Sequence, residues 1–143
     1  SIAANGDRAV SRGDESGTHK REKQLWVDAE GRPQWEGYVE SGQGMGATLT
    51  MADQMRAYVL SDRGTFLKFK KKVGLVPLVT SSESLRNPYG IMVVNPQKHP
   101  SIHGPLAQAF VDFMISNDAQ RLICDYQVEG EQLFYPLRLF NEN

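Results

Sequence analysis

In the first half of the chain, a short apolar stretch runs through a polar or glycine-rich turn into a helical pattern three times. The apolar stretches are residues 8–11, 35–41 and 57–61. Strands that alternate with helices are typical of βα units, so the pattern predicts an α/β fold. The length of 143 residues suits one domain, or one lobe of a larger protein, with enough chain to bury a core.

The remaining elements follow from apolar patterning. The helix after the third strand is expected to end in the lysines of residues 70–72, followed by a strand at residues 75–79. Residues 87–96 carry a strong strand signal at their centre. Two helices then close the chain, and Asn117 with Gln120 is typical of a capping box. Core packing explains their two apolar stripes, which are Leu106, Phe110, Phe113 and Met114, then Ala119, Leu122, Ile123 and Tyr126.

Composition and sparse reactive residues exclude several function classes. Lys and Arg number 16 against 17 Asp and Glu, for a formal net charge of -1, whereas a nucleic-acid binder of this size usually shows a basic excess. No apolar stretch approaches the roughly 20 residues that cross a bilayer. The single cysteine, Cys124, excludes an internal disulfide and is expected to be a small core side chain.

Catalysis and metal binding also find little support. The three histidines, His19, His99 and His103, lack metal-ligand spacing. No serine lies in a nucleophile-elbow pattern. We therefore expect no enzyme activity, no catalytic residue, no metal and no cofactor.

Residues 11–18 combine the features of an oxyanion site. They lie at a strand-to-helix junction, where free backbone N–H groups and the positive end of the helix dipole meet an anion. Glycines permit the turn, hydroxyls donate hydrogen bonds, and a guanidinium supplies charge and a planar fork. The residues concerned are Arg12, Gly13, Ser16, Gly17 and Thr18.

The alternative for the same residues is a well-capped helix without a ligand, with Asp14 or Ser16 as the N-cap. The basic residues 19–21 lie in the first helical turn, where cations oppose the dipole, and a bound anion would compensate them. Taken alone, these three residues indicate a solvated charged face.

A second glycine-rich turn, residues 42–46, supports a rival hypothesis of a nucleotide-dependent enzyme. A relaxed dinucleotide fingerprint is satisfied by Gly42, Gly44 and, in its third position, Ala47, and Asp62 follows about twenty residues on, where a ribose-binding acid is expected. However, Glu36 and Glu40 make the preceding strand too polar for the buried centre of a parallel sheet. No hydride-transfer constellation follows, and an N-cap is the favoured interpretation of Asp62.

Several blocks, in family order and covering most of the chain, resemble the periplasmic tungstate-binding proteins of ABC importers, which are related to phosphate- and molybdate-binding proteins. The blocks are residues 11–23, 40–48, 60–65, 87–90, 94–96 and 130–134. The resemblance implies a type II periplasmic-binding-protein fold, whose lobes have a mixed sheet flanked by helices. Residues 1–80 would form the second α/β lobe, and residues 81–143 the return strand and C-terminal helices. The first lobe would lie upstream of Ser1.

The resemblance also implies a function outside the cytoplasm, in the periplasm or on the extracellular side of the membrane. The protein would deliver tungstate or molybdate to the permease of an ABC importer. A ligand-sensing domain of a transcription regulator shares this fold and stays open as an alternative. A lobe separated from its partner lobe is also expected to self-associate through the exposed cleft or hinge face.

Whether the ligand carries a proton decides which role Asp14 can have. Tungstate and molybdate at pH 7 are unprotonated dianions, so they need only donors. Arg12 would neutralise their charge, while Ser16, Thr18 and the N–H groups near Gly17 would bind their oxygens. Asp14 pointing inward would repel such a dianion but would accept a proton from hydrogen phosphate. We expect Asp14 to pair with Arg12, and the ligand to be tungstate or molybdate rather than phosphate.

Overall fold

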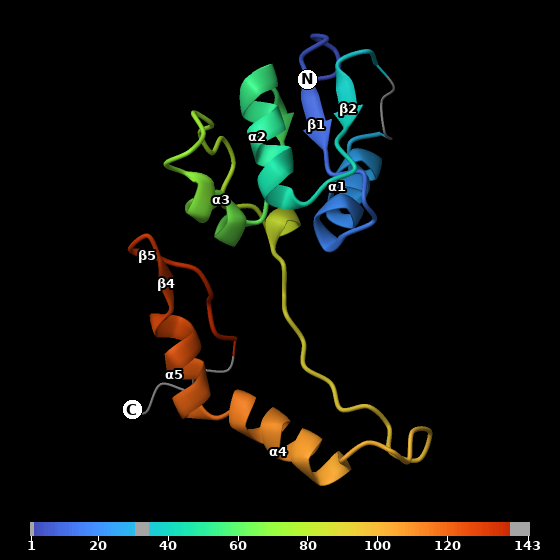
Figure 1. The fold of residues 1–143 in the computed structure, drawn as a ribbon, viewed down its shortest axis with the longest axis vertical. Coiled ribbons are helices and arrows are strands. Elements are labelled where there is room, and N and C mark those ends of the chain that lie inside the picture. The colour runs from blue at the N-terminus through green and yellow to red at the C-terminus, as the bar shows by residue number, and fades with distance from the viewer. Residues whose placement is uncertain (1, 31–34, 138–143) are drawn as a thin grey trace. The chain divides into compact units, whose positions relative to one another are not determined.

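The computed structural model describes residues 2–30 and 35–137 and divides the chain into two compact units, Ser1–Leu85 and Arg86–Asn143 (Figure 1). The first unit alternates strands with helices, which confirms the α/β class. Within the described ranges, no helix combines the length and the apolar character needed to cross a membrane.

The first unit is built on a three-stranded parallel sheet. Its strands are β1 (Ala9–Ser11), β2 (Tyr38–Glu40) and β3 (Tyr58–Val59), in the order β2-β1-β3. Val10 of β1 lies opposite Val39 on one side and Val59 on the other. All three residues of β1 are buried, as the central strand of a parallel sheet requires. The three expected strands are therefore confirmed.

Strand β2 is shorter than the apolar stretch that contains it, because the chain turns before Tyr38. The Tyr38 N–H donates to the Trp35 carbonyl over 3.1 Å, and the Trp35 indole N–H donates to the Asp7 carbonyl over 2.7 Å. A Cβ at Gly37 would lie 2.8 Å from that same carbonyl, so only glycine fits where the two segments meet.

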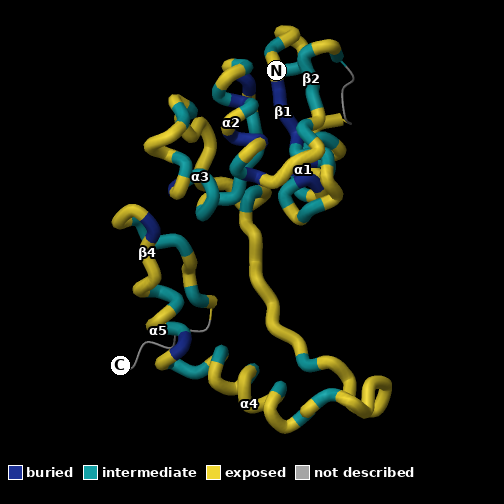
Figure 2. The backbone as a smooth tube through the Cα atoms, in the orientation of Figure 1, coloured by how far each residue is buried: buried dark blue, intermediate teal, exposed yellow. Residues whose placement is uncertain are grey.

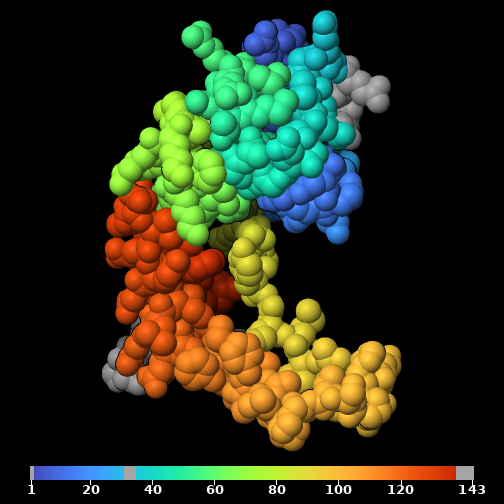
Figure 3. Space-filling model, viewed as in Figure 1, coloured from blue at the N-terminus to red at the C-terminus, as the bar shows by residue number. Residues whose placement is uncertain are grey.

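One helix follows each strand. The helices are α1 (Gly17–Asp28), α2 (Met45–Met55) and α3 (Arg63–Phe69). Helix α2 packs against β1 and α3, and its Ala52 joins Val10 and Ala57 in the core of the unit. Figure 3 shows the side chains of α2 and α3 in contact on one face. The ring of Phe69 packs against Gly46 here, so closely that a Cβ would lie 2.5 Å from the ring.

The prediction that α3 extends through the lysines was wrong. The helix ends at Phe69, and the Lys72 N–H donates to the Phe69 carbonyl in a turn. The Gly74 N–H then donates to Asp53 of α2 over 2.8 Å, which holds the returning chain. Residues 75–79 form no strand, because no described strand pairs with them. A 3₁₀ turn, η1 (Glu83–Leu85), ends the unit.

The second unit contains two helices and a hairpin. Its elements are α4 (Gly104–Met114), α5 (Asn117–Asp125), β4 (Gln127–Val128) and β5 (Glu131–Gln132). Both predicted helices are confirmed, but the predicted capping box is not. Ser116 is the N-cap of α5, since its Oγ accepts from the Ala119 N–H over 3.3 Å. Asn117 is therefore already the first helical residue.

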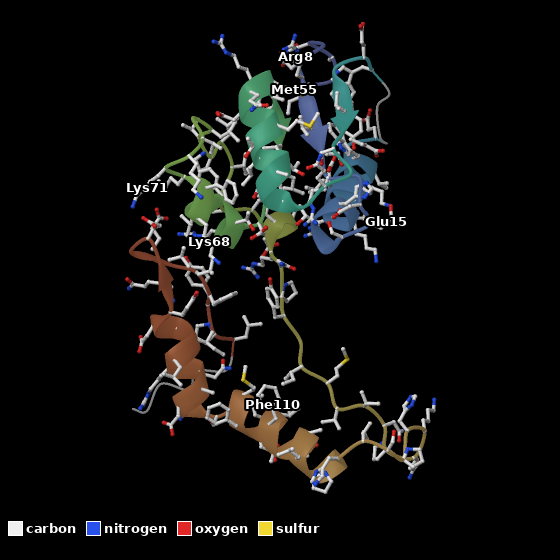
Figure 4. All side chains as sticks on the ribbon, viewed as in Figure 1. Arg8, Glu15, Met55, Lys68, Lys71 and Phe110 are labelled. Atoms are coloured by element: carbon white, nitrogen blue, oxygen red, sulfur yellow. The ribbon has the colours of Figure 1, made fainter. Side chains whose placement is uncertain are left out.

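The second unit also departs from two further predictions. Residues 87–96 form no strand, because a strand needs a hydrogen-bonding partner and no described strand pairs with them. Core packing of the two stripes is wrong for most of their members (Figure 2). Phe110 of α4 is 57% exposed and Leu122 of α5 is 67% exposed, whereas Ala119 is buried. Figure 4 labels Phe110 on α4. These apolar side chains lack a covering surface within the described chain.

Candidate oxyanion site

The candidate site is the turn that joins β1 to α1. Strand β1 ends at Ser11 and the helix begins at Gly17, so the turn is short. Two of its residues have left-handed backbones, Gly13 with a φ of 63° and Glu15 with a φ of 57°. A Cβ at Gly13 would lie 2.8 Å from the Glu40 Cβ, so glycine is required there. Figure 4 labels Glu15 beside α1.

Ser16 begins the helix, which decides between the two expected N-caps. Its Oγ accepts from the His19 N–H over 3.3 Å. Asp14 instead caps the turn, because its Oδ1 accepts from the Ser16 N–H over 3.2 Å. Helix capping is thus confirmed for Ser16. Capping by Ser16 is compatible with an oxyanion bound at Gly17 and Thr18, because the capping hydrogen bond uses neither of their N–H groups.

Arg12 and Asp14 form the expected ion pair. Arg12 Nη2 donates to Asp14 Oδ2; Arg12 is half-buried and Asp14 is exposed. Hydrogen bonds from Ser16, and then the Arg12 guanidinium, hold the pKa of the Asp14 carboxyl below its usual range. Both oxygens of Asp14 therefore accept hydrogen bonds already. Each oxygen of the ionised carboxylate is thus held by a donor of the protein, Oδ1 by Ser16 and Oδ2 by Arg12.

The backbone N–H groups of the turn are divided between protein acceptors and free donors. The Gly13 N–H donates to Ser11 Oγ over 3.3 Å, and the Glu15 N–H donates to His19 Nδ1 over 3.0 Å. The N–H groups of Gly17 and Thr18 meet no acceptor in the part of the chain that the structure describes. These two are adjacent, at the positive end of α1, which is where an anion is stabilised.

Arg12 contributes a further unused donor. Its Nε is buried and has no hydrogen-bond partner among the described residues. A buried donor without an acceptor costs free energy, and a bound group that accepts from it removes that cost. Together with the Thr18 hydroxyl, the site therefore offers donors and positive charge, which suits a ligand that carries only acceptors.

The sequence did not reveal the two buried side chains that support the turn. Glu22 of α1 accepts from Ser11 Oγ over 2.6 Å, from Tyr38 Oη over 2.7 Å and from Trp26 Nε1 over 3.1 Å. His19 lies one helical turn earlier and is only 4% exposed. The prediction of a solvated charged face was therefore wrong for His19. The spacing of residues 19, 22 and 26 was the available signal, because it puts all three on one face of α1.

The glycine-rich turn at residues 42–46 and the residue before it form hydrogen bonds to the backbone where the oxyanion turn begins. The Gly42 N–H donates to the Arg12 carbonyl over 2.8 Å, and the Ser41 N–H donates to the Ser11 carbonyl over 2.9 Å. Asp62, the expected ribose acid of the rival hypothesis, is the N-cap of α3 and accepts from the Thr65 N–H over 2.8 Å. The capping interpretation of Asp62 is confirmed.

Outside this turn, the described residues offer no metal cluster and one free cysteine. Cys124 is half-buried, and its sulfur accepts from Gln132 Nε2 over 3.4 Å. Among residues 2–30 and 35–137, no cluster of His, Cys, Asp and Glu has an arrangement that could hold a metal ion.

Residues 2–118 match the PBP superfamily domain. This chain belongs to the PBP superfamily. It is 45% identical over 129 residues to the tungstate-binding protein TupA of Peptoclostridium acidaminophilum, an alignment that covers 89% of this chain and 45% of that relative. The chain spans less than half the length of the curated relatives that it matches.

Two solved structures share the fold of this PBP domain. One is the tungstate-binding protein TupA from Desulfovibrio alaskensis G20, with a TM-score of 0.82, 38% identity, and coverage of 96% of this chain and 57% of that one. The other is described as the tungstate ABC transporter from Geobacter sulfurreducens, with a TM-score of 0.75, 46% identity, and coverage of 87% and 53%. The expected type II periplasmic-binding-protein fold is confirmed.

Proposed function

We propose that this chain is the second lobe of an extracytoplasmic solute-binding protein that binds a tetrahedral oxyanion, tungstate or molybdate, and delivers it to the permease of an ABC importer. One observation carries the proposal. At the start of α1, the two adjacent N–H groups of Gly17 and Thr18 and the buried Arg12 Nε lack protein acceptors in the described chain. The names of the TupA relatives support the choice of ligand and transporter.

The site residues have separate roles in this proposal. Arg12 neutralises part of the ligand charge through its guanidinium. Gly17 and Thr18 donate their N–H groups, and Thr18 also donates its hydroxyl. Ser16 ends the turn and directs the helix N-terminus at the ligand. Asp14 stays ionised and paired with Arg12, which orients the guanidinium.

The state of Asp14 favours a ligand without a proton. A phosphate-binding site at neutral pH needs an acceptor for the proton of hydrogen phosphate. Both Asp14 oxygens already accept hydrogen bonds, one from Ser16 and one from Arg12. We therefore expect tungstate and molybdate to bind more tightly than phosphate.

We further propose a first lobe that completes the site and covers the apolar side chains exposed here. Residues 1–80 then correspond to the second lobe, and residues 81–143 to the segment that returns to the first lobe and the C-terminal helices. Two observations support this division. The relatives are about twice as long as this chain, and the apolar residues Met92 and Leu106 are 88% and 65% exposed. Membership of a substrate-binding family supports transport rather than catalysis.

Calorimetry on the two-lobed protein tests the proposal. Tungstate should bind more tightly than phosphate, and Arg12→Ala should weaken tungstate binding by more than about tenfold, or about 1.4 kcal/mol. Lys20→Ala is the matched control, because it removes a cation from the same helix end, and its affinity should stay within about threefold. Tighter binding of phosphate contradicts the choice of ligand. An unchanged affinity in Arg12→Ala removes Arg12 from the site.

A further inference from the structure

We propose that His19 is a positioning residue for the oxyanion site: its unprotonated Nδ1 holds the Glu15 N–H, so that protonation of the imidazole loosens the turn and weakens ligand binding. This inference rests on the proposed function of the turn. It assigns His19 no contact with the ligand. The argument starts from the hydrogen bonds that His19 makes on both sides of the N-cap.

His19 ties the turn to the helix at two points. Its own N–H donates to Ser16 Oγ, and its Nδ1 accepts from the Glu15 N–H over 3.0 Å. Glu15 has a left-handed backbone, with a φ of 57°, which is unfavourable for a residue with a side chain. The bond to Nδ1 holds Glu15 in this conformation. The backbone of Glu15 leads directly into Ser16 and Gly17, so the bond sets where the free N–H groups point.

The hydrogen bond defines the state of the imidazole. A ring nitrogen that accepts from an N–H carries no proton, so neutral His19 has its proton on Nε2. Nε2 is buried, has no hydrogen-bond partner among the described residues, and lies 3.9 Å from Glu40 Oε1. The Glu40 side chain also lies against Gly13. The ring therefore lies between the turn and the end of β2.

Protonation of Nδ1 removes the acceptor of the Glu15 N–H and directs two donors at each other. The charged groups around the ring are Glu15 in the turn, Glu40 on β2, and Lys23 on α1. Glu15 Oε1 lies 3.4 Å from Nδ1 and is the nearest acceptor for the new proton, while Lys23 Nζ holds the same carboxylate over 2.7 and 2.9 Å. Both carboxylates stabilise a protonated ring. The backbone N–H of Glu15 is then left without its partner.

The expected sign follows from these contacts. While the ring is neutral, Nδ1 holds the Glu15 N–H and the site is organised. Once the ring is protonated, this hydrogen bond is lost and the affinity for the ligand falls. A solely structural role for His19 predicts lower stability on substitution and no titration of affinity.

Three variants of the two-lobed protein separate these outcomes. His19→Asn replaces Nδ1 by an amide oxygen on the same Cγ, an acceptor that does not protonate. His19→Leu removes the acceptor. His103→Asn is the matched control, because His103 Nδ1 also accepts a backbone N–H, from Leu106 over 3.1 Å, at the start of α4 in the second unit. Calorimetric titrations with sodium tungstate at about pH 8 and about pH 5.5 span the ordinary range of histidine protonation.

The wild type and His103→Asn should lose about tenfold in affinity from the higher to the lower pH, or about 1.4 kcal/mol. His19→Asn should keep its affinity for tungstate at the higher pH and lose much less of it at the lower pH. The loss that remains measures the contribution of the ligand and of other groups that take up protons. His19→Leu should bind weakly at both pH values. An equal pH dependence in His19→Asn and the wild type overturns the inference. Absence of tungstate binding by the wild type at about pH 8 overturns the proposed function instead.

Nitrogen NMR of the imidazole provides a readout that needs neither ligand nor variant. At the higher pH, His19 should show an unprotonated Nδ1 and a protonated Nε2. The Glu15 N–H should be protected from exchange and should lose that protection at the lower pH. A His19 ring with its proton on Nδ1 at the higher pH contradicts the inference, whatever the variants do to stability.

Discussion

Glu22 is the buried carboxylate that joins β1, α1 and β2, so its replacement by alanine should destabilise the first unit. Its Oε2 accepts from Ser11 Oγ over 2.6 Å, and its Oε1 accepts from Tyr38 Oη over 2.7 Å and from Trp26 Nε1 over 3.1 Å. The Ser11 hydroxyl is almost fully buried, at 1% exposed. Removal of the carboxylate therefore leaves one buried and two half-buried donors without their acceptor.

The magnitude follows from these three donors. A hydrogen bond to a charged group contributes about 1.5–3 kcal/mol, and a buried donor left unpaired costs about 1–3 kcal/mol. Tyr38 and Trp26 are half-buried, so water replaces part of what they lose. The alanine variant also no longer buries a charge, which offsets part of the loss. We expect Glu22→Ala to lower the free energy of unfolding by about 2–4 kcal/mol.

Urea unfolding followed by circular dichroism measures this change without using the fluorescence of Trp26, whose environment the substitution alters. Glu22→Gln keeps the shape and one acceptor oxygen and should lose about half as much. Glu36→Ala removes an exposed glutamate next to β2 and should stay within about 0.5 kcal/mol of the wild type. A free energy of unfolding for Glu22→Ala within about 0.5 kcal/mol of the wild type would refute the reasoning.

Two further predictions concern the helix contact and the ion pair. Gly46→Ala should lower the thermal midpoint of unfolding, because its Cβ would lie 2.5 Å from the Phe69 ring. Overpacking of this kind costs about 1–3 kcal/mol, which exceeds the gain of about 1 kcal/mol from the higher helix propensity of alanine. Gly17→Ala, where nothing lies within 4 Å, is its control, and equal midpoints would contradict the clash. Carbon NMR should find the pKa of Asp14 below its usual range, and Ser16→Ala and Arg12→Gln should each raise it. Because the pKa of Asp14 is lower in the folded state, Asp14 stabilises the fold at a pH above its unfolded pKa, and this stability is lost as the pH falls through the folded pKa. An Asp14 pKa that neither variant moves would exclude Ser16 and Arg12 as the cause.

The sequence predicted the features that depend on neighbours along the chain. The three βα units, the turn at residues 12–18 and the cap at Asp62 all follow from local composition and spacing, whereas the cap of α1 stayed open between Asp14 and Ser16 until the structure decided it. The Arg12–Asp14 pair also lies within one turn and could be inferred from ligand chemistry.

The supporting side chains could not be inferred in the same way. Glu22 meets Ser11 across 11 residues and Tyr38 across 16 residues, and His19 lies near Glu40 only because β2 pairs with β1. A polar residue on a helix has the same local sequence whether water or a buried hydroxyl is its partner. The spacing of polar residues on α1 marks a face, but it does not say what that face contacts.

The failed strand predictions have a related cause. Residues 75–79 and 87–96 have strand composition, but a strand forms only where another strand supplies hydrogen bonds. In the described chain no such partner is present for either segment, and Val76 and Met92 are 71% and 88% exposed.

The sequence by itself thus determined which segments form helices, where the backbone must turn, and which donors gather at residues 12–18, because these properties arise within a few residues. The tertiary structure alone decided which N–H groups remain free for a ligand. That division depends on Ser11, Asp14 and His19 each accepting one N–H of the turn, while Glu22 fixes the Ser11 hydroxyl from α1. Hydrogen bonds form only at close range and in the right direction, and the bonds of Ser11 and Tyr38 to Glu22 hold α1 in that geometry.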